Sequence, residues 1–170
     1  TAVHALLVDA SSPNEAASLW VGLESGLARV SWDASGARVT QRSDDLDVRS
    51  LADLDGRLWV GTWGRGLGQL GPEGVTFPLG GSPGRIAALA TVGGALYAAT
   101  AGEGLWRARE GRMEPVPGGP ESPFLWSVGA WNGRLLAGGT TGLWSLGGGT
   151  EPLLRGDVRA LALHGTELLV

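Results

Sequence analysis

A repeated segment constrains the fold of this chain more than any other feature of its sequence. Four copies begin with a short apolar run and end in Gly-Leu, and a fifth copy is partial. Their leading leucines, Leu19, Leu58, Leu96 and Leu135, are 38 or 39 residues apart. A fixed period of this length is typical of repeat architectures, in which each unit buries its apolar surface against the next. We therefore expect an array of similar units.

Each unit contains four predicted strands. An apolar entry strand is followed by a Leu/Trp strand, a Gly-Leu strand and a weaker, polar or proline-bearing strand. Proline cannot donate to a sheet ladder, so Pro78, Pro115 and Pro152 place the fourth strand at the outer edge of each sheet. The predicted entry strands span 3–8, 48–54, 86–92, 125–131 and 158–163.

The inner strands are apolar on successive residues, as at 58–60 and 95–99, which indicates burial on both sheet faces. The 30 glycines suit tight turns, and no long segment has helical periodicity. Repeated four-stranded units of this kind predict an all-β fold, a β-propeller. We expect a single, incomplete propeller domain over 1–170, with blades at about 1–44, 45–82, 83–120 and 121–156 and the first two strands of a fifth at 157–170.

The tryptophans follow the repeat. Trp20 and Trp59 lie in second strands and Trp106 and Trp144 in third strands, where we expect them to fill the core between blades. Trp63 differs, because it falls in the turn between the second and third strands, where the other copies have no tryptophan.

The second copy, RLWVGTWGRGL at 57–67 preceded by VRSLADLDG at 48–56, resembles the repeats called two-component regulator propellers. Those repeats read roughly as an entry strand, Asp-x-x-Gly, Leu-Trp-Val-Gly-Thr and Gly-Gly-Leu. The likeness covers the whole chain but weakens in later copies, where Tyr97 and Leu136 replace the tryptophan. The resemblance implies a bacterial sensor domain, because such propellers commonly form the extracytoplasmic input region of hybrid two-component regulators, where they bind a ligand or dimerise. The implied location is periplasmic or extracellular.

The partial fifth unit leaves the closure of the ring open. A blade without a neighbour exposes an apolar sheet face of a size that soluble monomers rarely leave bare. Three explanations are considered: the sequence is a fragment of a larger ring, copies associate to cover the open blade, or the four units nearly close by themselves. We favour the fragment.

Charge and composition exclude several functions. The chain has no lysine, 13 arginines against 17 acidic residues, and a net charge of −4, so it offers no basic surface for nucleic acid. It has no cysteine for disulfide or thiol chemistry. No apolar run is long enough to span a membrane. We expect no cofactor.

Catalytic and metal-binding patterns are sparse. His4 is the second residue of an entry strand and His164 follows one, so the two histidines should lie at opposite ends of the channel. A histidine-based catalytic pair or metal site is therefore not expected. Asp53, Asp55 and Gly56 lack the further ligands of a calcium loop, and we interpret them as a turn.

A candidate site emerges when equivalent positions are stacked around the ring. The second residues of the entry strands are His4, Arg49, Ala87, Trp126 and Arg159. The turns between second and third strands should reach the same channel mouth and add further arginine, tryptophan and glutamate side chains. Arginine suits carboxylate, phosphate or vicinal hydroxyls, and tryptophan offers an apolar plate, for example to a sugar face. The candidate ligand-binding residues are His4, Arg49, Trp63, Arg65, Glu103, Trp126 and Arg159.

These patterns favour a non-enzymatic binding or sensory module that presents one channel mouth to a small polar ligand or a protein partner. Two alternatives stay open. The candidate residues could be ordinary solvated loop residues with Arg–Asp pairs between neighbouring blades, or the chain could be a lyase or hydrolase with its active site at the channel mouth. An insertion at 9–18, DASSPNEAAS, is interpreted as a neutral loop extension or a contact with a neighbouring domain or subunit.

Overall fold

The computed structural model describes residues 2–9, 18–147, 151–164 and 167–170, and these residues form strands and their connections without any helix. The predicted insertion therefore lies almost entirely outside the described residues. The first two sheets contain β1 (Val3–Val8), β2 (Ser18–Leu23), β3 (Gly26–Asp33) and β4 (Gly36–Asp44), then β5 (Val48–Leu54), β6 (Arg57–Thr62), β7 (Leu67–Gly71) and β8 (Gly74–Thr76).

The next two sheets have the same antiparallel order, and a two-stranded sheet follows them. Their strands are β9 (Ile86–Val92), β10 (Ala95–Thr100), β11 (Gly104–Arg109) and β12 (Arg112–Pro115), then β13 (Leu125–Trp131), β14 (Arg134–Gly139), β15 (Gly142–Ser145) and β16 (Leu154–Arg155), and finally β17 (Ala162–His164) and β18 (Glu167–Leu169). The predicted all-β architecture of four-stranded blades is confirmed.

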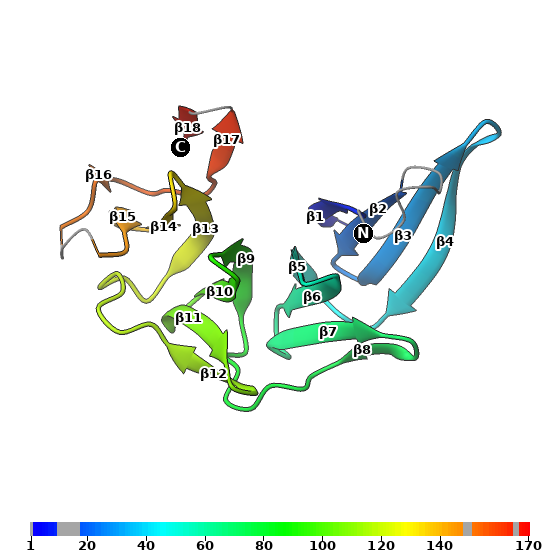
Figure 1. Cartoon of the computed structure of the whole chain (residues 1–170), viewed down its shortest axis with the longest axis horizontal. Coiled ribbons are helices and arrows are strands. Elements are labelled where there is room, and N and C mark those ends of the chain that lie inside the picture. The colour runs from blue at the N-terminus through cyan, green and yellow to red at the C-terminus, as the bar shows by residue number, and fades with distance from the viewer. Residues whose placement is uncertain (1, 10–17, 148–150, 165–166) are drawn as a thin grey trace.

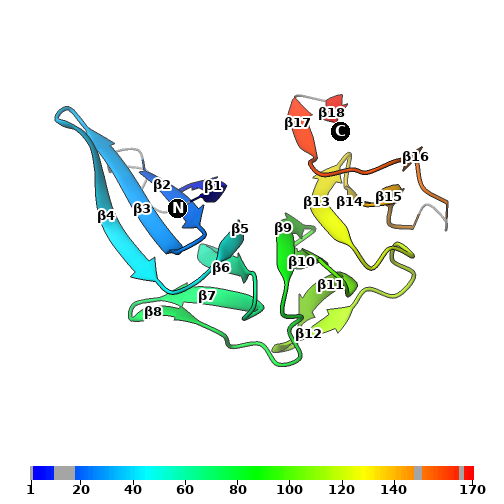
Figure 2. The same cartoon turned by 180° about the vertical axis from the view of Figure 1, so that it is seen from behind.

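Strand order within each four-stranded sheet follows the chain, so the fourth strand is an outer edge, as predicted. Of the three prolines, only Pro115 lies within a fourth strand, because Pro78 follows β8 and Pro152 precedes β16. Figures 1 and 2 show the four sheets side by side along an arc, with β1, β5, β9 and β13 innermost. The arc is open between β1 and β17–β18 (Figure 1), which does not favour the explanation that the four units nearly close by themselves. On β1, Val3, Leu6 and Val8 are exposed. The expectation that another blade or a second copy covers this face stays a prediction.

The core lies between neighbouring sheets, where the first residue of an entry strand packs into a gap left by glycine. Val48 and Ile86 are fully buried, and Val158 is nearly so. A Cβ atom on Gly61 would lie 2.7 Å from Cγ2 of Ile86, and one on Gly138 would lie 2.4 Å from Cγ1 of Val158. Glycine at this position therefore allows close packing in three of the units, whereas the third unit has a fully buried alanine, Ala99, there.

Two details differ from the sequence-based expectations. Trp20, Trp59 and Trp144 are buried as expected, whereas Trp106 is only half-buried and packs at the margin of the core between the second and third sheets. The fifth entry strand was predicted over 158–163, but β17 covers only Ala162–His164, because its partner β18 offers three residues for pairing. Asp53, Asp55 and Gly56 do form a turn, in which the Gly56 N–H donates to Oδ1 of Asp53.

Candidate functional site

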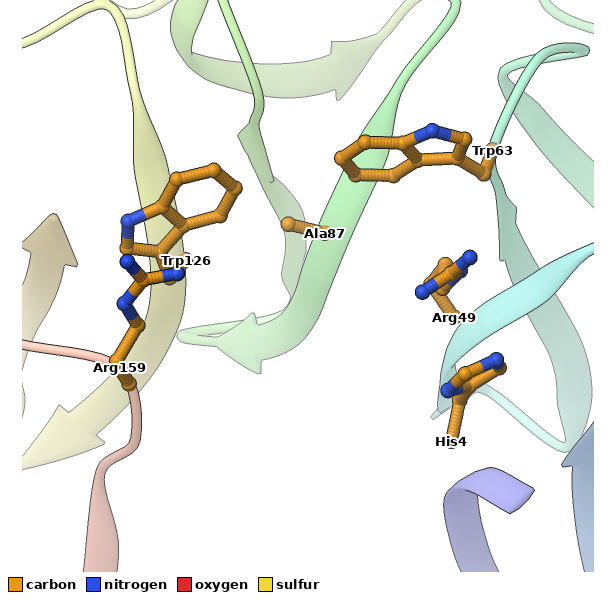
Figure 3. Close-up of a pocket in the computed structure, with 6 residues that line it drawn as sticks. All are labelled: His4, Arg49, Trp63, Ala87, Trp126 and Arg159. Carbon is orange, nitrogen blue, oxygen red and sulfur yellow. The ribbon is translucent and has the colours of Figure 1, made fainter. Parts of the chain in front are cut away.

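A pocket of about 310 Å³ opens at one mouth of the central channel. In Figure 3, Trp63, Arg49 and His4 line one side, Trp126 and Arg159 line the other, and Ala87 lies between them. All five stacked second positions are therefore brought together, and Trp63 joins them from the β6–β7 turn. A binding role for these residues stays a prediction.

β-Bulges explain why the second residues face the channel. In β1, the ladder register passes from Val3 opposite Leu23 to Ala5 opposite Gly22, so His4 is left without a partner. The register skips the second residue in the same way in the other three entry strands, at Arg49, Ala87 and Trp126. A bulge inserts one extra residue and re-aims its side chain. One bulge per blade thus delivers one side chain per blade to the pocket.

Asp47 organises the wall that carries Arg49 and Trp63. Its carboxylate accepts two hydrogen bonds from Arg49, from Nε and Nη2, each 2.7 Å long. Its backbone carbonyl accepts the N–H of Trp63 at 2.8 Å. The guanidinium carbon of Arg49 consequently lies 5.2 Å from the ring centroid of Trp63, within the range of a cation–π contact. The hydrogen bonds to Asp47 hold the pKa of Arg49 above its ordinary value, against the opposing effect of burial.

The backbone bond that positions Trp63 is a property of the repeat. The equivalent turn residues Glu24, Ala101 and Thr140 donate their N–H groups to the carbonyls of Ala2, Arg85 and Phe124. Every blade therefore holds this turn position beside its own entry strand, and only the second blade places a tryptophan there.

The opposite wall pairs Trp126, on β13, with Arg159, which lies in the segment between β16 and β17. The guanidinium carbon of Arg159 lies 4.7 Å from the ring centroid of Trp126. Nε of Arg159 donates one 2.7 Å hydrogen bond to Asp157, and both side chains of this ion pair are substantially exposed. Phe124 supports Trp126 from the side, with ring centroids 6.3 Å apart.

Two nitrogen atoms at the pocket are buried and make no hydrogen bond with the described residues: Nε2 of His4 and Nε1 of Trp126. The nearest carboxylate oxygen to Nε2 of His4 is Oδ1 of Asp47, at 3.9 Å. Unpaired buried donors and acceptors are uncommon in folded proteins and raise the value of a partner that can reach them.

Arg65 and Glu103 were predicted to join the site, and the structure does not bring them into the pocket. Both lie in turns in which a threonine hydroxyl accepts a hydrogen bond from the backbone. The N–H of Arg65 donates to Oγ1 of Thr62, and that of Glu103 donates to Oγ1 of Thr100. The Arg65 guanidinium instead stacks on Phe77, 4.3 Å from the ring centroid and just beyond the outer strand β8. Glu103 is exposed.

Three contributors were absent from the predicted site residues. Ala87 lines the pocket, and its small side chain leaves the space between the two tryptophans open. Asp47 and Asp157 orient the two arginines from behind. A signal for these aspartates was present in the sequence, because the tripeptide Asp-Val-Arg occurs at both 47–49 and 157–159. The bulges have no comparable signature.

The pocket is suited to binding. Its lining has arginine, tryptophan, histidine and alanine side chains and no carboxylate or hydroxyl group. Among the described residues, no group of three histidine, cysteine, aspartate or glutamate side chains could hold a metal ion. Within the same residues no helix is long and apolar enough to cross a membrane.

Solved structures similar to this chain include extracellular regulator domains. One, assigned to a one component system of B. thetaiotaomicron, is 20% identical with a TM-score of 0.75, over 99% of this chain and 25% of the other. Another, assigned to a hybrid two component system of B. thetaiotaomicron, is 24% identical with a TM-score of 0.66, over 83% and 21%. The WD40 β-propeller domain of Doa1 is 14% identical with a TM-score of 0.62, over 96% and 59%.

These likenesses show the propeller fold, and they agree with the resemblance of the repeats to two-component regulator propellers. This chain spans about a quarter of the length of the first two structures. Neither a protein-family model nor a curated protein matches the chain.

Proposed function

We propose that the chain is a non-enzymatic sensory module of a bacterial regulator, located outside the cytoplasm, and that it binds a small polar ligand in the pocket lined by Arg49, Trp63, Trp126 and Arg159. The observation that carries the proposal is the convergence of one bulged residue from each blade on a single pocket. A bulge interrupts the sheet ladder, and bulges are often found beside functional sites. The similar extracellular domains support the sensory role and the location.

The lining also supports binding over catalysis. General acid–base chemistry needs a group that exchanges protons near neutral pH and a second group placed to work with it. The lining has one histidine and no carboxylate that could work with it, and the Nε2 atom of this histidine, His4, is buried. Arginine stays protonated, and tryptophan and alanine exchange no protons at that pH. The set provides recognition by stacking and by hydrogen-bond donation.

A thermal-shift screen of small sugars, amino acids, nucleosides and carboxylates tests the proposal. The natural chain would be compared with Ala87→Phe, which fills the pocket, and with Ala37→Phe, a matched control at an exposed position of β4. A ligand present at 100 times its Kd stabilises the folded state by about 2.7 kcal/mol. We expect a ligand to raise the Tm of the natural chain and the control, and not that of Ala87→Phe. A compound that stabilises all three chains equally binds elsewhere and contradicts the proposal, as does a screen in which nothing binds.

A further inference from the structure

The hydrogen-bonding groups of the pocket restrict the chemistry of its ligand. This step rests on the proposed function. Nε and Nη2 of Arg49 are used by Asp47, and Nε of Arg159 is used by Asp157. Among the described residues, Nη1 of Arg49 and both Nη atoms of Arg159 make no hydrogen bond. Each wall of the pocket therefore offers guanidinium N–H donors that are free to meet a ligand.

Acceptors are almost lacking on the same surface. Arginine and tryptophan only donate hydrogen bonds, and alanine does neither, so His4 is the only residue in the lining whose side chain can accept one. A ligand rich in hydroxyl groups would bring donors that need acceptors, and leaving a buried donor unpaired weakens binding by about tenfold or more. A ligand that ends in oxyanions brings acceptors alone. The lining therefore matches an anion better than a polyol.

The two arginines are separated, which indicates two anionic groups. Figure 3 shows Arg49 and Arg159 on opposite sides of the pocket, with Ala87 and the tryptophan rings between them. Their aspartates hold each guanidinium group from behind and do not line the pocket. Arg85, whose guanidinium carbon lies 5.8 Å from the Trp63 ring, adds a positive charge with no ion-pair partner among the described residues. The pocket volume of about 310 Å³ is at the small end for ligand sites.

We propose that the ligand is a small α,ω-dicarboxylate, with one carboxylate on the free N–H groups of Arg49, the other on those of Arg159, and an apolar middle over Ala87 between Trp63 and Trp126. Carboxylate is the planar acceptor that a guanidinium group binds best, and such charge-assisted hydrogen bonds are stronger than neutral ones. The aspartates fix both guanidinium groups, so the site should distinguish dicarboxylates by length.

Calorimetric titration with the unbranched dicarboxylates from succinate to suberate tests the inference. The neutral diamide of each length serves as the matched probe. We expect one length to bind most tightly and its diamide to bind at least about tenfold more weakly, because hydrogen bonds to charged groups contribute more than neutral ones. Arg49→Gln and Arg159→Gln should each weaken dicarboxylate binding about tenfold or more. Arg159 is largely exposed, so its substitution should not disturb folding.

Arg65→Gln is the control variant, because Arg65 also stacks on an aromatic ring but lies outside the pocket. Its affinity should stay within about twofold of the natural chain. Equal binding of diacid and diamide would overturn the inference. So would unchanged affinity in both arginine variants, or the absence of saturable binding for every length. A neutral compound that stabilises the natural chain and not Ala87→Phe would overturn the dicarboxylate and leave the proposed binding function standing.

Discussion

The two walls of the pocket hold an arginine against a tryptophan in different ways. On the first wall, Arg49 and Trp63 belong to one sheet and its turn, and Asp47 binds both, the first through two side-chain hydrogen bonds and the second through its backbone. On the second wall, Trp126 lies on β13 and Arg159 lies in the segment between β16 and β17, and Asp157 supplies one hydrogen bond. The Arg159 side chain is 65% exposed, against 32% for Arg49.

This difference indicates that the first wall is fixed within a blade, whereas the second depends on how the segment between β16 and β17 packs on the fourth sheet. The segment that carries Arg159 is held to the fourth sheet by Val158, which is buried against Gly138 and whose N–H donates to the carbonyl of Gly139 at 2.9 Å. Disturbing that contact should affect one arginine–tryptophan pair and leave the other intact.

Gly138→Ala should therefore have the largest effect among variants of the two walls. The added Cβ would lie 2.4 Å from Cγ1 of Val158 and 2.5 Å from Oγ of Ser127, and overpacking of this kind costs about 1–3 kcal/mol of folding free energy. Urea unfolding measures the loss of stability. Gly80→Ala is the control, because a Cβ atom there meets nothing within 4 Å, and its stability should change by less than about 1 kcal/mol. Equal free energies of unfolding for the two variants would show that a Cβ atom at position 138 is accommodated without overpacking, which contradicts the prediction.

The blade architecture could be predicted from the sequence because the same strand pattern recurs in each repeat. The period, the glycine of the second strand and the edge prolines each point to the same blade, and the structure agrees with them. The predicted fifth entry strand was too long because its apolar residues resemble those of the other copies. Apolar residues alone do not form a strand. Val158 is buried by packing, but residues 159–161 have no ladder partner, and pairing begins only at Ala162.

Part of the pocket lining could be predicted from the sequence for a different reason. Counting positions from the start of each entry strand grouped residues that line one pocket, because the bulge recurs at the same position in four blades. The turn residues Arg65 and Glu103 were misplaced, since the direction of a side chain in a turn depends on local hydrogen bonds such as those to Thr62 and Thr100. Sequence position alone could not supply those bonds.

Aspartate substitutions would sharpen the comparison between the walls. Asp47→Asn removes the negative charge and one of the two oxygens that accept hydrogen bonds from Arg49 at a partly buried pair, and we expect a loss of about 1 kcal/mol. Asp157→Asn weakens a single bond at an exposed pair, and its effect should stay below about 0.5 kcal/mol. Urea unfolding of both variants under the same conditions gives the difference. A larger loss in Asp157→Asn would reverse the assignment of the fixed wall.

The smallest expected effect is the change with pH in the stability that the Arg49–Asp47 pair contributes to the first wall. The pKa of Arg49 is raised by its hydrogen bonds to Asp47, so the stability that this pair contributes is present below the ordinary arginine pKa and is lost only as the pH rises beyond it. In Arg49→Lys the ammonium group titrates near ~10.4, and its contribution should be lost as the pH passes that value. The stability gap between the two chains, measured by urea unfolding, should therefore widen by about 0.5 kcal/mol or less from pH 8 to about pH 11. Taking the difference at each pH cancels the titration of the groups that the two chains share. A gap that narrows on raising the pH would mean that the ion pair with Asp47 does not stabilise the first wall.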